Sequence, residues 1–136
     1  MKLIVLTAPS GAGKTTIAHR VMDAVPGLQF SISATTRPPR EGEQDGVDYF
    51  FLSEGEFESR VARAEFIEHA TVHDHRYGTL RATVQDAMQA GKSVLMDIDV
   101  QGARQLREVL EHAASDDILR RGFVDIFIAP PSLDAL

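Results

Sequence analysis

Apolar runs alternate with segments of helical periodicity along the first part of the chain. Residues 2–7 are nearly all apolar and rich in Leu, Ile and Val, which is typical of a strand buried on both faces of a parallel sheet. A glycine-containing turn follows, and residues 14–25 then repeat apolar positions at helical spacing until Pro26 and Gly27. Residues 28–33 predict a second strand, so this order of elements predicts one right-handed βαβ unit.

The middle of the chain has a different pattern. Residues 34–48 contain two prolines and two glycines and predict an extended loop, and residues 49–52 predict a short strand. Ser53 and Glu56 form a capping box that opens an amphipathic helix to about Arg63. We expect antiparallel hairpins in this region, as an excursion from a parallel core.

The second half returns to alternating strands and helices. We predict strands over residues 66–73, 93–98 and 123–129, and helices over residues 80–90 and 101–112, with a polar loop before the last strand. Ser132 follows two prolines and predicts the first turn of another helix at residues 132–136. His73 and His75 are interpreted as a solvated hairpin end rather than as metal ligands.

Composition narrows the function classes. The 136 residues include 20 acidic and 14 basic side chains, and the net charge of −6 disfavours general binding to nucleic acid or to anionic membranes. Without cysteine, the chain has no disulfide, no thiolate nucleophile and no Cys-based zinc site. No apolar stretch near the start is long enough for a membrane span or a convincing signal peptide, so we expect a cytoplasmic protein. Composition predicts no oligomeric state.

A phosphate-binding loop follows the first predicted strand. The segment APSGAGKT at residues 8–15 matches the P-loop pattern G-x-x-x-x-G-K-[ST] at every fixed position but the first, where alanine replaces glycine. Backbone N–H groups of such a loop surround a phosphate, the lysine reaches the β- and γ-phosphate oxygens, and the Thr hydroxyl can bind Mg²⁺. The residues predicted to bind ATP are Ala8, Pro9, Ser10, Gly11, Ala12, Gly13, Lys14, Thr15 and Thr16. The alternative is a glycine turn with a solvated lysine.

Two aspartates end the strand predicted at residues 93–98. Asp97 and Asp99 lie where a P-loop enzyme keeps the acidic partner of its Mg²⁺, and their spacing predicts that both face the same side. The alternative is a solvated strand end, or a cap for the helix that follows.

The loop region contains a second candidate anion site. Arg37 and Arg40 are separated by two prolines that stiffen the backbone, which suits bidentate recognition of a phosphate monoester. The chain's only two tyrosines lie downstream, together with the carboxylates Glu68 and Asp99. A carboxylate that accepts two parallel N–H bonds suits the N1–H and N2 amino edge of guanine, since adenine has no such donor pair. The alternatives are solvated loop arginines, half-buried strand aromatics and an exposed carboxylate.

These residues belong to motifs with which the chain resembles the guanylate kinases, enzymes that transfer a phosphoryl group from ATP to GMP. Besides the P-loop, the motifs are SATTRPPR from Ser33, GVDYFF from Gly46, EFIE from Glu65, YGT from Tyr77, DIDVQG from Asp97 and IAPPS from Ile128. The resemblance covers nearly the whole chain. It implies a P-loop three-layer α/β fold, with a parallel core over residues 1–32 and 80–136 and a small mixed α/β GMP-binding region over residues 33–79.

The resemblance also implies a role for each matching residue. The GMP-binding residues would be Ser33, Arg37, Arg40, Tyr49, Glu68, Tyr77, Thr79 and Asp99, of which Glu68, Thr79 and Asp99 would contact the guanine. Lys14, Arg37 and Arg40 would neutralise the charge on the transferring phosphoryl group, and Thr15 and Asp97 would serve Mg²⁺. For Asp99 we favour guanine recognition over metal ligation.

The end of the chain departs from this family's pattern. Guanylate kinases continue past the Pro-Pro-Ser turn into a helix, an arginine-bearing lid over ATP, an adenine-contacting segment and a final helix. We therefore expect the chain to be C-terminally incomplete and to bind GMP better than it turns GMP over. Two alternatives are a non-catalytic guanylate-kinase-like module that binds phosphorylated peptides, against which the intact P-loop argues, and a P-loop kinase for another small phosphate ester.

Overall fold

The structure is a computed structural model that describes residues 1–8 and 14–128, with residues 14 and 15 described in their backbone only. The chain divides into two compact units. Unit 1 consists of Met1–Ser31 and Val84–Leu136, and unit 2 consists of Ile32–Thr83. The predicted helix at residues 132–136 and most of the predicted P-loop lie outside the described residues.

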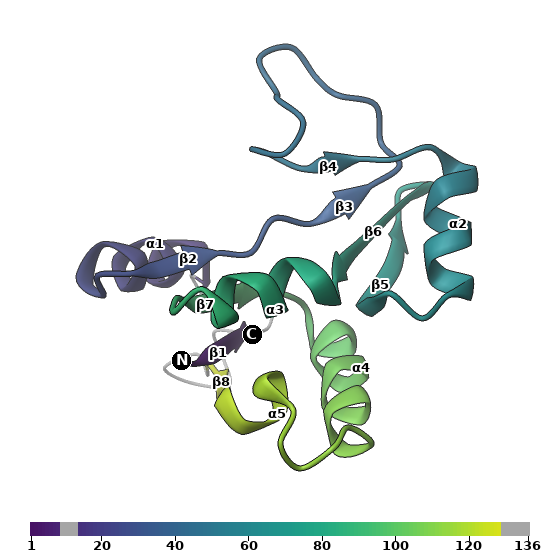
Figure 1. Ribbon diagram of the computed structural model, residues 1–136. Helices are drawn as coiled ribbons and strands as arrows, with labels where there is room; N and C mark the ends of the chain where they lie inside the picture. The colour runs from purple at the N-terminus through teal and green to yellow at the C-terminus, as the bar shows by residue number, and fades with distance from the viewer. Residues whose placement is uncertain (9–13, 129–136) are drawn as a thin grey trace, which may run out of the picture. The chain divides into compact units, whose positions relative to one another are not determined.

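Unit 1 is built on a four-stranded parallel sheet (Figure 1). Its strands are β1 (Leu3–Thr7), β2 (Leu28–Phe30), β7 (Ser93–Asp97) and β8 (Phe123–Phe127), in the order β2-β7-β1-β8. β1 pairs with β7 and β8, and β2 pairs with β7, all in parallel. Because every strand runs in the same direction, the carboxyl ends of all four meet at one edge of the sheet.

Three helices pack against this sheet: α1 (Lys14–Ala24), α4 (Val100–Glu111) and α5 (Ile118–Gly122). A further helix, α3 (Arg81–Gln89), begins in the last residues of unit 2 and continues into unit 1. α1 packs against β1, β2 and β7, while α4 and α5 contact β1. Ala18 of α1 lies in one apolar cluster with Leu6, Leu28 and Leu95 of the strands, so the nearly all-apolar strands of the sequence are buried as predicted.

Unit 2 contains a mixed sheet with one helix (Figure 1). The elements are β3 (Ala34–Thr35), β4 (Phe50–Phe51), α2 (Glu54–Ala62), β5 (Phe66–Val72) and β6 (His75–Leu80), and the strand order is β4-β3-β6-β5. β6 pairs antiparallel with both β3 and β5, whereas β3 and β4 are parallel.

One face of the unit 2 sheet packs with α2. The buried side chains of this cluster are Ala34, Phe57, Phe66 and Leu80, with Phe50, Leu52 and Val61 partly buried against them. α2 begins as predicted, because the Ser53 hydroxyl accepts a hydrogen bond from the Glu56 N–H at 3.1 Å. Only this half of the predicted capping box forms, since the Glu56 carboxylate instead pairs with Arg60 at 2.9 Å.

The structure corrects several predicted elements. The second strand ends at Phe30, and β3 forms inside the segment predicted as loop. β3 and β4 are parallel rather than a hairpin, because the long loop over residues 36–49 returns the chain to the end at which β3 began. α5 occupies part of the predicted polar loop; the Asp117 carboxylate caps it by accepting the Leu119 N–H at 2.9 Å.

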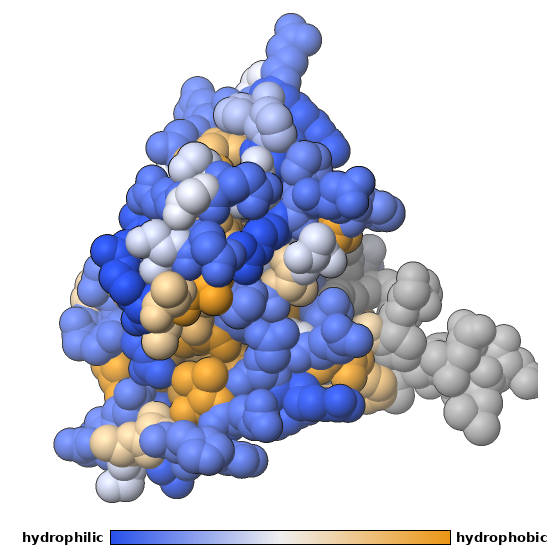
Figure 2. Space-filling model, turned by 90° about the vertical axis from the view of Figure 1, so that its right-hand side faces the viewer, coloured by the Kyte–Doolittle hydropathy of each residue, from blue (hydrophilic) through white to orange (hydrophobic). Residues whose placement is uncertain are grey.

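One face of the molecule is largely polar (Figure 2). Figure 2 shows a face covered mostly by hydrophilic residues, with the apolar ones in separate patches. Within the described part of the chain, no helix has the length and the apolar character that a membrane span requires.

Candidate functional site

A β-bulge in unit 2 decides which way Glu68 faces. Phe66 is opposite Leu80 on β6, but Glu68 is opposite the next residue, Thr79, so Ile67 is the extra residue on β5. Phe66 and Leu80 both belong to the apolar cluster with α2. With regular alternation Glu68 would share the face of Phe66, and the bulge instead brings it beside Thr79 on the opposite face.

Glu68 and Thr79 form a buried polar pair. The Thr79 hydroxyl donates a hydrogen bond to the Glu68 Oε1 at 2.8 Å, and the two residues are 1% and 9% exposed, respectively. A hydroxyl that donates to one oxygen restrains the orientation of the carboxylate, which helps it to accept hydrogen bonds from a planar ligand in a defined geometry. Two of the predicted guanine-binding residues are therefore in direct contact.

Gly78 allows the strands to approach closely at this point. A Cβ at Gly78 would lie 2.7 Å from the Phe66 Cδ1, 2.8 Å from the Glu68 carbonyl oxygen and 2.9 Å from the His69 Cβ. No side chain fits there, so the glycine in the YGT motif is explained by packing between β5 and β6.

Both tyrosines lie with the same group of side chains. Tyr77 is two residues before Thr79 on β6 and therefore shares its face of the sheet. The ring of Tyr49 is 6.1 Å from that of Tyr77, edge to face, and 5.8 Å from that of Phe51. The two tyrosines predicted to hold a phosphate thus contact each other, although they are far apart in sequence.

Arg37 joins this group from the loop after β3. Its guanidinium carbon lies 5.1 Å from the centre of the Tyr49 ring, and its backbone N–H donates to the Thr35 hydroxyl at 3.1 Å. The residue is 7% exposed, which is rare for an arginine unless its charge is paired. The partner is Glu43, with two hydrogen bonds of 2.9 Å from the guanidinium to the two carboxylate oxygens.

The Arg37–Glu43 pair shifts the pKa values of both groups. The hydrogen bond to Glu43 raises the pKa of Arg37 most strongly; burial opposes this rise, and the Tyr49 and Tyr77 hydroxyls add to it. The hydrogen bonds from Arg37 and from the Arg40 backbone N–H lower the pKa of Glu43 to about 2. Both groups therefore remain charged at neutral pH.

Arg40 and Ser33 are less buried than Arg37. The Arg40 side chain is exposed, and its backbone N–H donates to the Glu43 Oε1 at 2.7 Å. Ser33 is half-buried, and its carbonyl accepts the Phe50 N–H at 2.9 Å beside the β3–β4 pair. Unit 2 thus brings Arg37, Tyr49, Tyr77, Glu68 and Thr79 together on or beside one sheet face, with Arg40 at the edge of the loop.

In unit 1, Asp97 lies beside the start of the predicted P-loop. It is the last residue of β7 and is in register with Leu6 of β1, and the Ile98 N–H donates to the Leu6 carbonyl at 3.3 Å. Ala8, which follows β1, is buried, and α1 begins at Lys14. The remaining loop residues and the side chains of Lys14 and Thr15 lie outside the described part of the chain; Thr16 is exposed.

Asp99 caps α4. Its Oδ1 accepts the Gly102 N–H at 2.7 Å, in the geometry of an N-cap residue. The strand ends at Asp97, so the alternation from which we predicted a common face for the two aspartates does not extend to Asp99. Asp97 and Asp99 remain close in sequence at the carboxyl edge of the sheet, one at a strand end and the other at a helix start.

Sequence reasoning missed Glu43, the residue that orients Arg37. It lies in a loop with proline and glycine, where no periodicity relates residues six apart, so only the fold identifies it as the partner. His73 lies at a hairpin end as predicted, because His73 and Asp74 have φ angles of 50° and 68° in the turn between β5 and β6, while His75 is the first residue of β6. The described residues contain no cluster of three or more metal-ligating side chains.

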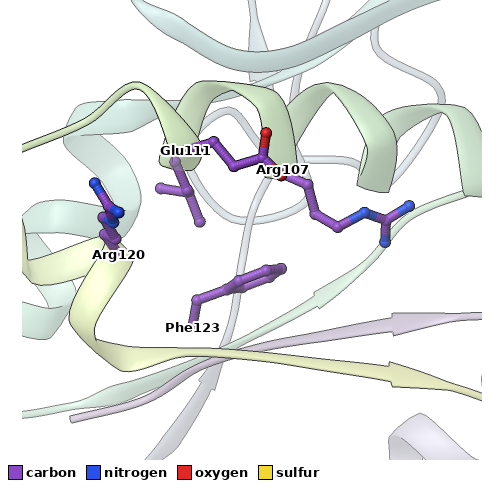
Figure 3. Close-up of a pocket in the computed structure, with 5 residues that line it drawn as sticks. Arg107, Glu111, Arg120 and Phe123 are labelled. Carbon is purple, nitrogen blue, oxygen red and sulfur yellow. The ribbon is translucent and has the colours of Figure 1, made fainter.

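A cavity of about 270 Å³ lies elsewhere in unit 1, between α4, α5 and β8 (Figure 3). Arg107, Leu110, Glu111, Arg120 and Phe123 line it. Arg107 pairs with Asp125 at 2.5 Å, and Arg120 donates to the Ala113 carbonyl at 2.6 Å. Both guanidinium groups already have protein partners, and none of the predicted site residues lines this cavity.

Comparisons with known proteins agree with the motifs. The family model described as guanylate kinase matches residues 1–136. Guanylate kinases from Salinibacter ruber and Rhodopseudomonas palustris are 52% and 50% identical to this chain, each over 98% of it. A crystal structure of guanylate kinase from Anaplasma phagocytophilum aligns over 98% of the chain with a TM-score of 0.67 and 34% identity.

The relatives are longer than this chain. It covers 66% of the Salinibacter protein, 57% of the Rhodopseudomonas protein and 62% of the Anaplasma chain. The chain therefore spans about three fifths of the length of the proteins it matches.

Proposed function

The chain belongs to the guanylate kinase family, and from that premise we propose that it binds GMP through unit 2 and transfers a phosphoryl group to it from ATP. An oxygen of the GMP phosphate would attack the γ-phosphorus of ATP, the bond to the β-γ bridging oxygen would break, and GDP and ADP would result. We propose residues 33–79 as the GMP-binding region and residues 1–32 and 80–136 as the ATP-binding core, in a protein of the cytoplasm.

The observation that carries this proposal is the buried Glu68–Thr79 pair. A carboxylate that is 9% exposed and held by a hydroxyl at 2.8 Å is costly to bury unless it has a task. Its chemistry suits the N1–H and amino group of guanine, which donate in parallel, and disfavours the adenine edge, which presents an acceptor at N1. Asp99, at the α4 N-cap, is proposed as a second guanine contact.

The phosphate of GMP would be bound by Arg37, Arg40 and the tyrosine hydroxyls. The Arg37 guanidinium lies against the Tyr49 ring, Tyr49 contacts Tyr77, and the two hydroxyls raise the pKa of Arg37 by side-chain hydrogen bonding. Arginine forks and phenolic O–H groups are donors suited to a phosphate monoester. Ser33, one residue before β3, would lie near the same phosphate.

ATP and Mg²⁺ are proposed for the carboxyl edge of the unit 1 sheet. Residues 8–16 match the P-loop pattern, and the backbone N–H groups that begin α1 at Lys14 carry the positive end of the helix dipole. A threonine hydroxyl from Thr15 and a carboxylate from Asp97 are oxygen donors, the ligand type that Mg²⁺ prefers when nucleotide phosphates and water complete its shell. Bound there, Mg²⁺ would neutralise charge on the ATP phosphates.

No covalent protein intermediate and no strong base are needed for this reaction. The task of the protein is to bring two nucleotides in line and to offset the charge on the transferring phosphoryl group. Lys14, Arg37 and Arg40 are the side chains that we propose for this electrostatic role.

A nucleotide panel tests the proposal. The purified chain is titrated with GMP, AMP, UMP and CMP by calorimetry, and ADP formation from ATP and Mg²⁺ is followed with each. We expect GMP to bind at least tenfold more tightly than the other three and to be the acceptor that supports ADP formation. Equal affinity for all four would contradict a guanine site, and GMP binding with no stabilisation by ATP–Mg²⁺ would favour a binding module that lacks catalysis.

The substitution Glu68→Gln directly tests the proposed role of Glu68 in guanine recognition. The amide presents N–H donors toward the guanine donors, so we expect GMP affinity to fall by about two orders of magnitude while AMP affinity changes little. Glu54→Gln, an exposed carboxylate at the start of α2, is the matched control and should leave GMP affinity unchanged. Unchanged GMP affinity in Glu68→Gln would indicate a kinase for a different phosphate ester.

A further inference from the structure

The Arg37 side chain uses three of its five N–H donors for Glu43 and the Pro38 carbonyl. One Nη1–H donates to the Glu43 Oε1 at 2.9 Å and the other to the Pro38 carbonyl at 3.1 Å, while one Nη2–H donates to the Glu43 Oε2 at 2.9 Å. Glu43 therefore binds the end of the guanidinium where the two Nη atoms meet.

The two donors that remain lie together on one edge. In arginine, Nε–H and the second Nη2–H point in parallel from the side of the planar group. The hydrogen bonds of Arg37 to Glu43 and Pro38 use neither of these donors, and Tyr49 and Tyr77, whose hydroxyls raise the pKa of Arg37 by side-chain hydrogen bonding, are the residues in the ranges 1–8 and 14–128 that act on this guanidinium besides them. This edge is a two-donor fork of the kind that binds a phosphate in bidentate fashion.

We propose that Glu43 is a positioning residue for phosphate binding, which holds the Arg37 guanidinium by its end so that the side edge is presented to the phosphate of the acceptor nucleotide. The inference rests on the proposed function of unit 2 and adds to it a residue that does not itself contact the nucleotide. It also predicts the direction of the effect of Glu43 on phosphate affinity. A residue that orients Arg37 strengthens phosphate binding, whereas one that only competes with the phosphate for the Arg37 donors weakens it.

The loop gives Glu43 the rigidity that this role requires. Its carboxylate accepts the Arg40 backbone N–H at 2.7 Å, and its own backbone N–H donates to the Arg40 carbonyl at 3.0 Å. Arg37 is fixed in turn through its backbone N–H to Thr35 at 3.1 Å. Glu43 thus ties together the loop positions of both arginines, so the guanidinium is ordered before a ligand arrives.

The low exposure of Arg37 excludes a simple surface ion pair. Arg37 is 7% exposed and Glu43 is 20% exposed, so removal of the carboxylate leaves a largely buried guanidinium without its charged partner. The Arg37 side chain would then be free to turn toward other acceptors, such as the backbone carbonyl groups of the loop. Removal of Glu43 also adds one unit of positive charge near the phosphate, which by itself would favour binding, so the two effects oppose each other and the measured sign separates them.

The test compares GMP with guanosine on the wild-type chain and on Glu43→Gln, Glu43→Asp and Glu41→Gln. Guanosine carries the base and sugar without the phosphate. We expect Glu43→Gln to lower GMP affinity about tenfold and to change guanosine affinity less than twofold, with partial recovery in Glu43→Asp. Glu41 is an exposed carboxylate two residues earlier in the same loop, and its substitution should leave both affinities unchanged.

Several results would overturn the inference. Tighter GMP binding in Glu43→Gln would identify Glu43 as a competitor of the phosphate, unchanged GMP binding would make it irrelevant, and equal losses for GMP and guanosine would indicate general damage to unit 2. Inorganic phosphate, titrated on the same variants while the Arg37 Nε–H resonance is followed by NMR, separates this inference from the proposed function. A wild-type chain that binds phosphate in a Glu43-dependent manner but does not bind GMP would uphold the role of Glu43 and refute the guanine site.

Discussion

The two units position their predicted site residues by different physical means. In unit 1, Asp97 is at the end of a parallel strand, in register with Leu6 beside the start of the predicted phosphate loop. In unit 2, Glu68, Thr79 and Tyr77 lie within antiparallel strands, on a sheet face opposite the one that packs with α2. The first arrangement follows from strand direction alone, whereas the second depends on strand register and on a bulge.

Because of this difference, the two sites differ in their sensitivity to amino-acid substitutions. A strand end at the carboxyl edge keeps its place as long as the parallel sheet forms, because topology fixes it. A side chain within an antiparallel strand changes face if the register shifts by one residue. We therefore expect substitutions in β5 and β6 to affect the unit 2 site more strongly than substitutions of comparable size affect the unit 1 site.

Gly78→Ala should have the largest effect. The added Cβ would meet the Glu68 carbonyl at 2.8 Å and the Phe66 ring at 2.7 Å, so the backbone at the bulge must move. We expect a loss of about 2–3 kcal/mol in the free energy of unfolding, measured by urea denaturation, and a loss of GMP affinity.

Gly55→Ala is the matched control. Gly55 lies in α2, and a Cβ there would have no atom within 4 Å, so we expect a gain of about 0.5–1 kcal/mol from helix propensity and unchanged GMP binding. A Gly78→Ala chain as stable as wild type would mean that the close approach of β5 and β6 does not hold the register.

Substitutions of Asp99 distinguish its role in the stability of unit 1 from a role in ligand binding. Its Oδ1 caps α4, and asparagine caps helices as well as aspartate does. We expect Asp99→Ala to lower the free energy of unfolding by about 1 kcal/mol and Asp99→Asn to leave it nearly unchanged. Both should weaken GMP binding if Asp99 also contacts guanine. If Asp99→Asn binds GMP as wild type does, the residue is only a helix cap.

Much of unit 1 could be predicted from sequence, for a reason that the strands make clear. β1 and β7 are almost continuously apolar, as strands covered on both faces must be, and the helices between them begin and end at recognisable residues such as Gly91. In unit 1 the local sequence patterns therefore agree with the positions of the elements in the fold. Asp97 was accordingly found at the carboxyl edge, where the strand pattern predicted it.

Unit 2 could be predicted only in part. The helix start at Ser53 and the turn at His73 are local features and were found, but β3 is two residues long and its pairing with β4 joins segments separated by a long loop. The bulge at Ile67 leaves no periodic signal, since it breaks the alternation itself. The pairing of Arg37 with Glu43 is a tertiary contact within a loop, which no spacing rule predicts.

The pH dependence of the Arg37–Glu43 pair gives the smallest expected effect and the narrowest test of the unit 2 arrangement. The pKa of Glu43 is lowered to about 2 from an ordinary value of 4.5, so the folded chain binds this proton less readily than the unfolded chain does. The stabilisation is therefore complete above about pH 4.5 and is lost as the pH falls toward 2. In urea denaturation across this range, the stability advantage of wild type over Glu43→Gln should shrink as the pH falls, because the other carboxylates titrate alike in both chains. A constant advantage would mean that the ionised pair is not what orders the loop, and that the unit 2 site relies on its sheet alone.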